Sequence, residues 1–115
     1  MQGNPQTMQD KPSYQDVVGE ILDYLIARRD FCLAAGIDLR RICLDPGIGF
    51  GKSGADNIKL MTNINQLQNI HPHVCIGSSN KRFSSKLFDK VKTKEDLKIA
   101  NLASFVTSAL SNASY

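Results

Sequence analysis

Apolar residues recur with helical spacing in three stretches of the chain, and two short apolar runs lie between them. The first stretch follows Ser13, which fits a capping box with Asp16, and Gly36 is placed to end this helix. Its apolar positions are Val17, Val18, Ile21, Leu22, Leu25, Ile26, Cys32 and Leu33. Residues 42–44 and 74–77 are short, apolar and bounded by polar or turn residues, so they predict two buried strands.

Two further helices are predicted by the same capping chemistry. Ser53 and Asp56 open the second helix, which extends to about Ile70 and ends at the turn formed by residues 71–73. Its apolar positions are Ile58, Leu60, Met61, Ile64 and Leu67. Thr93 and Asp96 open the last helix, with Leu97, Ala100, Val106 and Leu110 among its apolar positions. A short helix over residues 83–88 is also expected.

The order of these elements predicts an α/β fold. Short apolar strands that alternate with amphipathic helices pair in parallel through right-handed crossovers. Two strands do not make a stable parallel sheet, because such a sheet is covered on both faces. We therefore expect the chain to be part of a barrel or of a doubly wound sheet, or to rely on a partner.

Composition excludes several classes of function. Apolar and charged residues make up 42% and 22% of the 115 residues, as in ordinary globular proteins. The net charge of +3 is mild and scattered, so we expect no nucleic-acid partner, and no apolar run reaches the roughly 18 residues that span a bilayer. The three cysteines have no C-x-x-C spacing and are expected to be reduced, mostly buried thiols of a cytoplasmic protein.

Polar loops rich in glycine follow both predicted strands, where parallel α/β folds bind their ligands. The first, residues 45–54, ends in Gly51-Lys52-Ser53 like a phosphate-binding P-loop, but Pro46 stands where that motif needs its first glycine. Its glycines have G-x-G-x-G spacing, which is not the G-x-G-x-x-G of a dinucleotide site. Both nucleotide interpretations therefore fail.

Individual residues in these loops have two interpretations each. Asp45 is either the carboxylate of an Asx-type turn or an acceptor for the two N–H groups of an aminopyrimidine edge. Phe50 is either a wall for an aromatic substrate or a core side chain, and Lys81 is either a solvated cation or a ligand contact. Residues 71–73, His-Pro-His, are interpreted as a plain turn rather than a metal site.

Three segments of the sequence resemble, in order, the motifs of the dihydropteroate synthase family. Residues 1–9 resemble its M-Q-G-x-P-x-T-M-Q loop, and residues 45–52, Asp-Pro-Gly-Ile-Gly-Phe-Gly-Lys, resemble its D-P-G-[IF]-G-F-G-K segment without exception. Residues 79–83, Ser-Asn-Lys-Arg-Phe, resemble its S-R-K-x-F motif. Together the motifs and the helices between them cover essentially the whole chain.

The resemblance implies a partial TIM (β/α)8 barrel, roughly the segment from the loop after strand 5 to the helix after strand 7. Residues 1–115 are then one partial pterin-binding domain, a fragment of a longer homodimeric protein. The implied reaction, usually with magnesium, condenses 4-aminobenzoate with 6-hydroxymethyl-7,8-dihydropterin pyrophosphate to give dihydropteroate and pyrophosphate. We expect the isolated fragment to be inactive, because it supplies about half of the site. We also expect it to be poorly folded, because open parallel strand edges and one-sided helices leave apolar surface exposed.

The resemblance also implies roles for single residues. Asp45 matches the aspartate that pairs with the pterin, Gly49 lines the pterin pocket, and Phe50 lines the aminobenzoate pocket. Lys81 matches the lysine that bonds the pterin, and it is the residue expected to be catalytic. Asn80 departs from the arginine usual in the family, and Arg82 is expected to compensate for it in part as a substrate-binding cation. Two alternatives remain, a truncated non-catalytic pterin-binding module and a pterin-dependent methyltransferase barrel.

Overall fold

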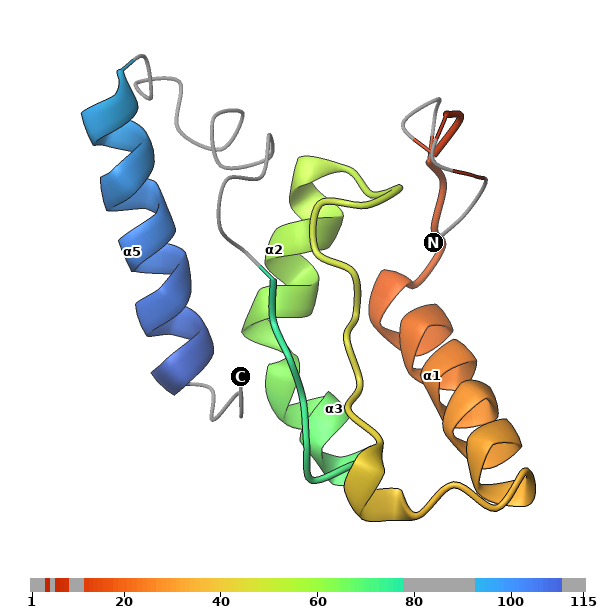
Figure 1. The fold of residues 1–115 in the computed structure, drawn as a ribbon. Coiled ribbons are helices and arrows are strands. Elements are labelled where there is room, and N and C mark those ends of the chain that lie inside the picture. The colour runs from red at the N-terminus through yellow and green to blue at the C-terminus, as the bar shows by residue number, and fades with distance from the viewer. Residues whose placement is uncertain (1–3, 5, 9–11, 78–92, 111–115) are drawn as a thin grey trace.

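A computed structural model describes residues 4, 6–8, 12–77 and 93–110 of the chain. In these ranges helices alternate with short extended segments, as the sequence predicts. The helices are α1 (Val17–Ala34), the 3-10 helix η1 (Leu39–Arg41), α2 (Gly54–Thr62), α3 (Ile64–Ile70) and α5 (Lys94–Leu110). Figure 1 shows α1 and α5 on opposite sides of α2 and α3, with two extended segments lying alongside the central helices. The loop over residues 78–82 and the expected helix over residues 83–88 lie outside the described residues.

The two predicted strands pair in parallel, but over one position only. Leu44 and Val74 form an isolated parallel bridge. The N–H of Leu44 donates to the carbonyl of His73 at 3.0 Å, and the N–H of Cys75 donates to the carbonyl of Leu44 at 2.9 Å. Parallel pairs are less stable per residue than antiparallel ones, so a pair with few strand neighbours forms a short ladder. The parallel arrangement is confirmed, and extended strands are not observed in the described part of the chain.

Helix α1 starts differently from the prediction. Its N-cap residue is Asp16, whose side chain makes no cap hydrogen bond, so the capping role predicted for Ser13 is wrong. The Glu20 carboxylate instead accepts from the backbone N–H groups of Gln15 and Asp16, at 2.8 and 3.1 Å. A carboxylate in the first turn of the helix can accept from these N–H groups just as well as a hydroxyl that precedes the helix.

The predicted end of α1 is confirmed at Gly36, which has a φ of 83°. The N–H of Gly36 donates to the carbonyl of Leu33 at 2.9 Å, and the N–H of Ile37 donates to that of Cys32 at 3.0 Å. This pair of bonds is a Schellman motif, which needs a residue in the left-handed region at the position of Gly36.

The second predicted helix is two helices, because the chain breaks at Asn63. The capping box of Ser53 and Asp56 is confirmed at the start of α2. At its end, the Thr62 hydroxyl donates to the carbonyl of Ile58 at 3.1 Å, and the Asn63 side-chain amide donates to that of Lys59 at 2.8 Å. Side chains that bond the carbonyls of the preceding turn compete with the helical ladder, and α3 starts afresh at Ile64.

The core lies between α1, the two extended segments and the α2–α3 pair. Its buried apolar side chains are Val17, Val18, Ile21, Leu25, Leu44, Ile48, Leu60, Met61, Ile64, Leu67 and Val74. Arg29 on α1 donates from Nη1 to the carbonyl of Ile70 at 2.5 Å, which ties α1 to the end of α3. Ile58, expected on the buried side of the second helix, is 41% exposed.

Helix α5 contacts α2, and the residues that it buries have small side chains. Thr93 and Asp96 form its predicted cap, since Asp96 accepts from the Thr93 N–H at 2.9 Å and Thr93 Oγ1 accepts from the Asp96 N–H at 3.1 Å. Its buried residues are Ala100 and Ser108, whereas all its large apolar side chains except the partly buried Leu97 are exposed. These exposed side chains are Ile99, Leu102, Phe105, Val106 and Leu110, called here the apolar face of α5.

The cysteines are free, but they are less buried than predicted. Cys43 is exposed, and Cys32 and Cys75 are partly buried. Cys43 and Cys75 lie one residue away from the buried Leu44 and Val74, and alternation along an extended segment turns them toward the opposite side. Among the described helices, none combines the length and the apolarity that crossing a membrane requires.

Candidate functional site

The loop after the first extended segment begins with Asp45. The Asp45 carboxylate is exposed, and its Oδ1 accepts from the N–H of Gly47 at 2.7 Å. This bond confirms the Asx-type turn predicted as one of the two interpretations. A carboxylate has about four acceptor positions on its two oxygens, so the turn leaves it able to bind a ligand as well.

Glycine is required at three positions of this loop. Gly47, Gly49 and Gly51 have φ values of 69°, 82° and 58°, in the left-handed region that side chains disfavour. The N–H of Phe50 donates to the carbonyl of Gly47 at 3.1 Å, closing a β-turn with Gly49 at its third position. A positive φ at that position is the requirement of a type II turn. The glycines therefore shape a folded turn rather than a cradle for phosphate.

Two buried polar side chains hold this turn from inside the molecule. Lys52 is 5% exposed, and its Nζ donates to the carbonyls of Gly47 and Phe50 at 2.9 and 3.0 Å. Asn57, on α2, is completely buried, and its Oδ1 accepts from the N–H of Gly49 at 2.7 Å. Burial lowers the pKa of Lys52, and the nearby Asp45 and Asp56 carboxylates oppose this effect.

Sequence reasoning missed both of these residues. From the sequence, Lys52 is the end of a failed P-loop motif and the last residue of the family segment, with no role assigned to its side chain. Asn57 shares the spacing of the buried positions of α2 and α3, which are Leu60, Met61, Ile64 and Leu67. A polar residue on the buried face of an amphipathic helix indicates an internal hydrogen-bond partner, and this signal was available in the sequence.

Phe50 has its side chain outside the core, at 41% exposure. The interpretation as a core side chain is therefore wrong, and a wall for a ligand stays a prediction. Asp45, Gly49 and Phe50 all lie on this one turn and its approach. Lys81, Arg82 and Asn80 lie outside the described residues, so their placement beside Asp45 remains a prediction.

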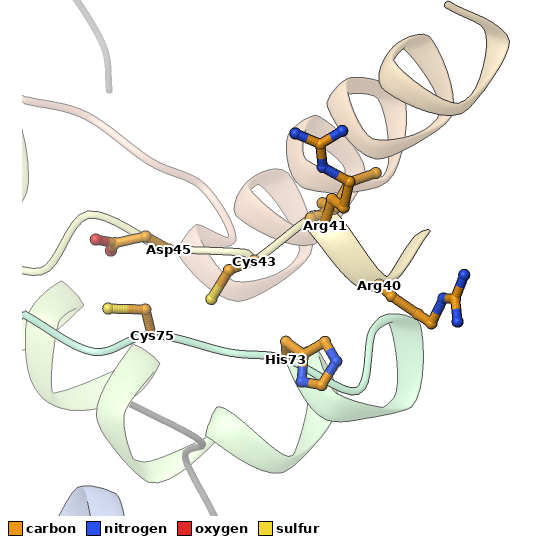
Figure 2. Close-up of a pocket in the computed structure, with 7 residues that line it drawn as sticks. Arg40, Arg41, Cys43, Asp45, His73 and Cys75 are labelled. Carbon is orange, nitrogen blue, oxygen red and sulfur yellow. The ribbon is translucent and has the colours of Figure 1, made fainter. Parts of the chain in front are cut away.

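A pocket of about 430 Å³ lies beside Asp45, between the two extended segments. Figure 2 shows side chains from both segments around it, with Asp45 and Cys75 toward one end and Arg40, Arg41 and His73 toward the other. Its lining residues are Arg40, Arg41, Ile42, Cys43, Asp45, His73 and Cys75. Burial raises the pKa of the Cys43 thiol, and the proximity of Cys75 and Asp45 raises it further, so the neutral thiol is favoured.

The turn of residues 71–73 is built around a buried imidazole. His71 is 1% exposed, and its Nδ1 accepts from the N–H of His73 at 3.0 Å. The interpretation as a turn fits this geometry. In the described part of the chain no three histidine, cysteine or acidic side chains gather closely enough to hold a metal ion.

Comparison with known proteins places this chain in a family. Residues 1–115 match the family described as "Pterin binding enzyme" over their whole length. The chain belongs to this pterin-binding family. Curated relatives named dihydropteroate synthase include that of Synechocystis, 37% identical over 95 residues, and that of Escherichia coli, 37% identical over 89 residues.

Solved structures of dihydropteroate synthases have the same fold as this member of the family. The enzyme of Yersinia pestis, solved with a sulfonamide drug, is 32% identical, and its match covers 98% of this chain and 40% of its own with a TM-score of 0.90. The enzyme of Thermus thermophilus, solved with 4-aminobenzoate, is 28% identical with a TM-score of 0.85. The predicted α/β barrel architecture is confirmed in this coarse form.

The matches cover only part of each relative. The chain spans 24% of the Neisseria meningitidis dihydropteroate synthase, 33% of the Synechocystis enzyme and 32% of that of Escherichia coli.

Proposed function

We propose that these residues form part of the barrel of a dihydropteroate synthase. The whole protein would condense 4-aminobenzoate with 6-hydroxymethyl-7,8-dihydropterin pyrophosphate, giving dihydropteroate and pyrophosphate. The segment proposed extends from the loop after barrel strand 5 to the helix after strand 7, and the whole protein is proposed to be cytoplasmic. The parallel bridge between Leu44 and Val74 supports this placement, because neighbouring strands of a barrel of this kind pair in parallel.

One observation carries the proposal: an exposed carboxylate, Asp45, lies beside a pocket and a rigidly held turn in a chain of the pterin-binding family. The aminopyrimidine edge of a pterin presents two parallel N–H groups. A carboxylate accepts both in a charge-assisted fork, which is roughly twice as strong as a neutral pair. Asp45 is therefore proposed to hold the pterin, with the backbone at Gly49 close to its ring.

The chemistry proposed needs orientation more than a strong base. The aryl amine of 4-aminobenzoate is neutral near pH 7, and its nitrogen attacks the methylene carbon that carries pyrophosphate. The C–N bond forms as the C–O bond breaks, the electron pair leaves with pyrophosphate, and the amine loses a proton. Phe50 is proposed to position the aminobenzoate ring, Lys81 to contact the pterin, and Arg82 to stabilise negative charge.

Magnesium belongs to this proposal only as an ion that accompanies the pyrophosphate. The described residues offer no group of three ligands for it, and the exposed Asp45 carboxylate is assigned to the pterin. No step of the proposed chemistry is therefore derived through a metal on these residues.

The substitution Asp45→Asn tests the proposal in the whole protein. An asparagine Oδ1 still accepts from the Gly47 N–H, so the turn is kept while the charge is lost. Hydrogen bonds to charged groups contribute about 1.5–3 kcal/mol, so the affinity for the pterin pyrophosphate is expected to fall about tenfold to a hundredfold. Isothermal titration with that compound measures the effect.

Asp23→Asn is the matched control, because Asp23 is an exposed carboxylate of α1 that does not line the pocket. Unchanged affinity in the Asp45 variant would contradict the proposed role. In a condensation assay with both substrates, the 115-residue chain alone is expected to show no dihydropteroate formation. Turnover by the isolated chain near that of ordinary enzymes would contradict its assignment to a larger barrel.

A further inference from the structure

Among the buried polar groups, Lys52 and Asn57 are the pair whose hydrogen bonds converge on the candidate site. We propose that Lys52 and Asn57 are positioning residues that fix the turn of residues 47–50 and thereby set the affinity for 4-aminobenzoate through Phe50. This inference rests on the proposed function. Neither side chain is expected to contact a substrate itself.

Lys52 closes the turn across its two ends. Its Nζ donates to the carbonyls of both Gly47 and Phe50. The same two residues are also joined by the bond from the Phe50 N–H to the Gly47 carbonyl. An ammonium has three donors, and two of them are used on the loop's own backbone. A lysine that is 5% exposed and bonded inward in this way is not available to a phosphate or a carboxylate outside.

Asn57 holds the middle of the same turn. Its Oδ1 accepts from the N–H of Gly49, and its Nδ2 donates to the carbonyl of Ser53 at 2.7 Å. The second bond anchors Asn57 to the capped start of α2. The turn is thus fixed at three backbone groups: the carbonyls of Gly47 and Phe50 and the N–H of Gly49.

The consequence falls on Phe50 more than on Asp45. Both backbone polar groups of Phe50 are bonded to the turn or to Lys52, while its side chain is exposed. Loss of the Lys52 bonds therefore frees the backbone that carries the proposed wall of the aminobenzoate pocket. Asp45 keeps its own bond to the Gly47 N–H and directly follows Leu44, which is bridged to Val74.

Lys52→Met in the whole protein tests this separation of effects. We expect KM for 4-aminobenzoate to rise about tenfold or more, since small displacements of a positioning group cost up to about a hundredfold. KM for the pterin pyrophosphate is expected to rise clearly less, because Asp45 keeps its own bond to the Gly47 N–H. Lys52→Met also removes a positive charge near the Asp45 carboxylate, so Asn57→Leu, which leaves that charge in place, is expected to give the same split between the two substrates. Lys59→Met is the control, because Lys59 is an exposed lysine of α2.

Asn57 provides a second pair of variants. Asn57→Asp keeps the acceptor for the Gly49 N–H but loses the donor to the Ser53 carbonyl, whereas Asn57→Leu loses both, so KM for 4-aminobenzoate is expected to rise less in Asn57→Asp than in Asn57→Leu. Hydrogen–deuterium exchange over residues 47–51, measured without ligand, is expected to accelerate in Lys52→Met and Asn57→Leu. It should accelerate less in Asn57→Asp and stay near the original rate in Lys59→Met.

An equal rise of both KM values, or unchanged exchange over residues 47–51, would overturn the proposal. A variant that loses its fold would accelerate exchange throughout the protein, and the Asn57→Asp and Asn57→Leu pair then decides the question. If the unsubstituted protein fails to condense the two substrates, the proposed function fails with this inference. If it condenses them and Lys52→Met leaves KM for 4-aminobenzoate unchanged, only this inference fails.

Discussion

Gly49 has a φ of 82° at the third position of the turn that Gly47 and Phe50 close. A side chain in this region costs about 1–2 kcal/mol, so Gly49→Ala is expected to destabilise the fold by about that amount. It should also weaken ligand binding, because relief of the strain moves the turn. Urea unfolding and titration with 4-aminobenzoate measure the two effects in the whole protein.

Gly36→Ala is the control for this prediction. Gly36 has a φ of 83° at the end of α1, and a Cβ there meets no atom within 4 Å. The same backbone strain is therefore introduced away from the loop. Similar destabilisation in both variants, with weaker binding only in Gly49→Ala, is the expected result, and equal binding in the two would contradict it.

Lys52 should give the protein a specific dependence of stability on pH. Burial lowers its pKa in the folded state, whereas the unfolded chain holds the proton up to about pH 10.4. Between the two pKa values the unfolded state binds more protons, so this residue makes the free energy of unfolding increase as the pH rises. Below the folded pKa both states are protonated, and the burial of the charge is unfavourable.

The variant Lys52→Met removes this contribution. Urea unfolding from about pH 7 to about pH 11 is expected to show a less positive slope for Lys52→Met than for the unsubstituted protein. Lys59→Met, at an exposed lysine, should keep the original slope. Identical slopes for all three proteins would mean that the pKa of Lys52 is not lowered in the folded state.

At the scale of single residues, the sequence predicts the exposed Asp45 and the glycines of the candidate loop. It does not predict the buried side chains that hold the loop from inside. Asp45 and the glycines follow from the position of the loop after a strand and from the demands of a tight turn. Lys52 could not be assigned because a lysine after a glycine loop is equally suited to a phosphate outside or to carbonyls inside. Only the three-dimensional structure shows that its Nζ is buried and bonded inward.

At the scale of elements, the start of α2 couples helix stability to the candidate site. Ser53 accepts from the Asp56 N–H at 3.2 Å, and its own carbonyl accepts from Asn57 Nδ2. Ser53→Ala removes a cap worth about 1 kcal/mol and loosens the anchor of Asn57. We expect lower stability by urea unfolding together with faster exchange of the amides of residues 47–51.

Thr93→Ala removes the equivalent cap at the start of α5. It should cost a similar amount of stability without changing exchange in the loop. Faster loop exchange in both variants would show that the effect is general destabilisation rather than the loss of a local anchor.

The helices show how far local signals determine an element. The boxes at Ser53 and Thr93 were predicted because the hydroxyl and the acidic residue are separated by the required three positions. The same spacing at Ser13 gives a wrong prediction, because the Glu20 carboxylate accepts from the N–H groups of Gln15 and Asp16 at the start of α1. The break at Asn63 was missed because the apolar spacing continues through it, and the side chains of Thr62 and Asn63 interrupt the ladder without disturbing the pattern.

At the scale of the whole molecule, apolar spacing locates the faces of helices but not what covers them. The pattern in α5 correctly indicated an amphipathic helix. However, its buried residues are Ala100 and Ser108, and Phe105 and Leu110 are 67% and 80% exposed. Figure 1 likewise places α5 at one side of the molecule. The periodicity of apolar residues shows which face of a helix is apolar. It does not show which other segment or protein packs against that face.

The apolar face of α5 bears on the homodimer that the family resemblance implies for the whole protein. A cluster of exposed large apolar residues is typical of a surface that another protein covers. If a second copy covers it, Leu102→Glu places a charge in the interface and should convert the dimer to a monomer, because an unpaired buried charge costs several kcal/mol. Thr107→Glu, at an exposed polar residue of the same helix, is the control and should leave the dimer intact.

Sedimentation velocity of the whole protein distinguishes the possible outcomes, and circular dichroism reports whether each variant is folded. A folded monomer for Leu102→Glu and a dimer for Thr107→Glu are expected. A folded dimer in both would show that a second copy does not cover α5. Loss of fold only in Leu102→Glu would instead mean that other segments of the same barrel cover this face, because charge burial then opposes folding rather than association.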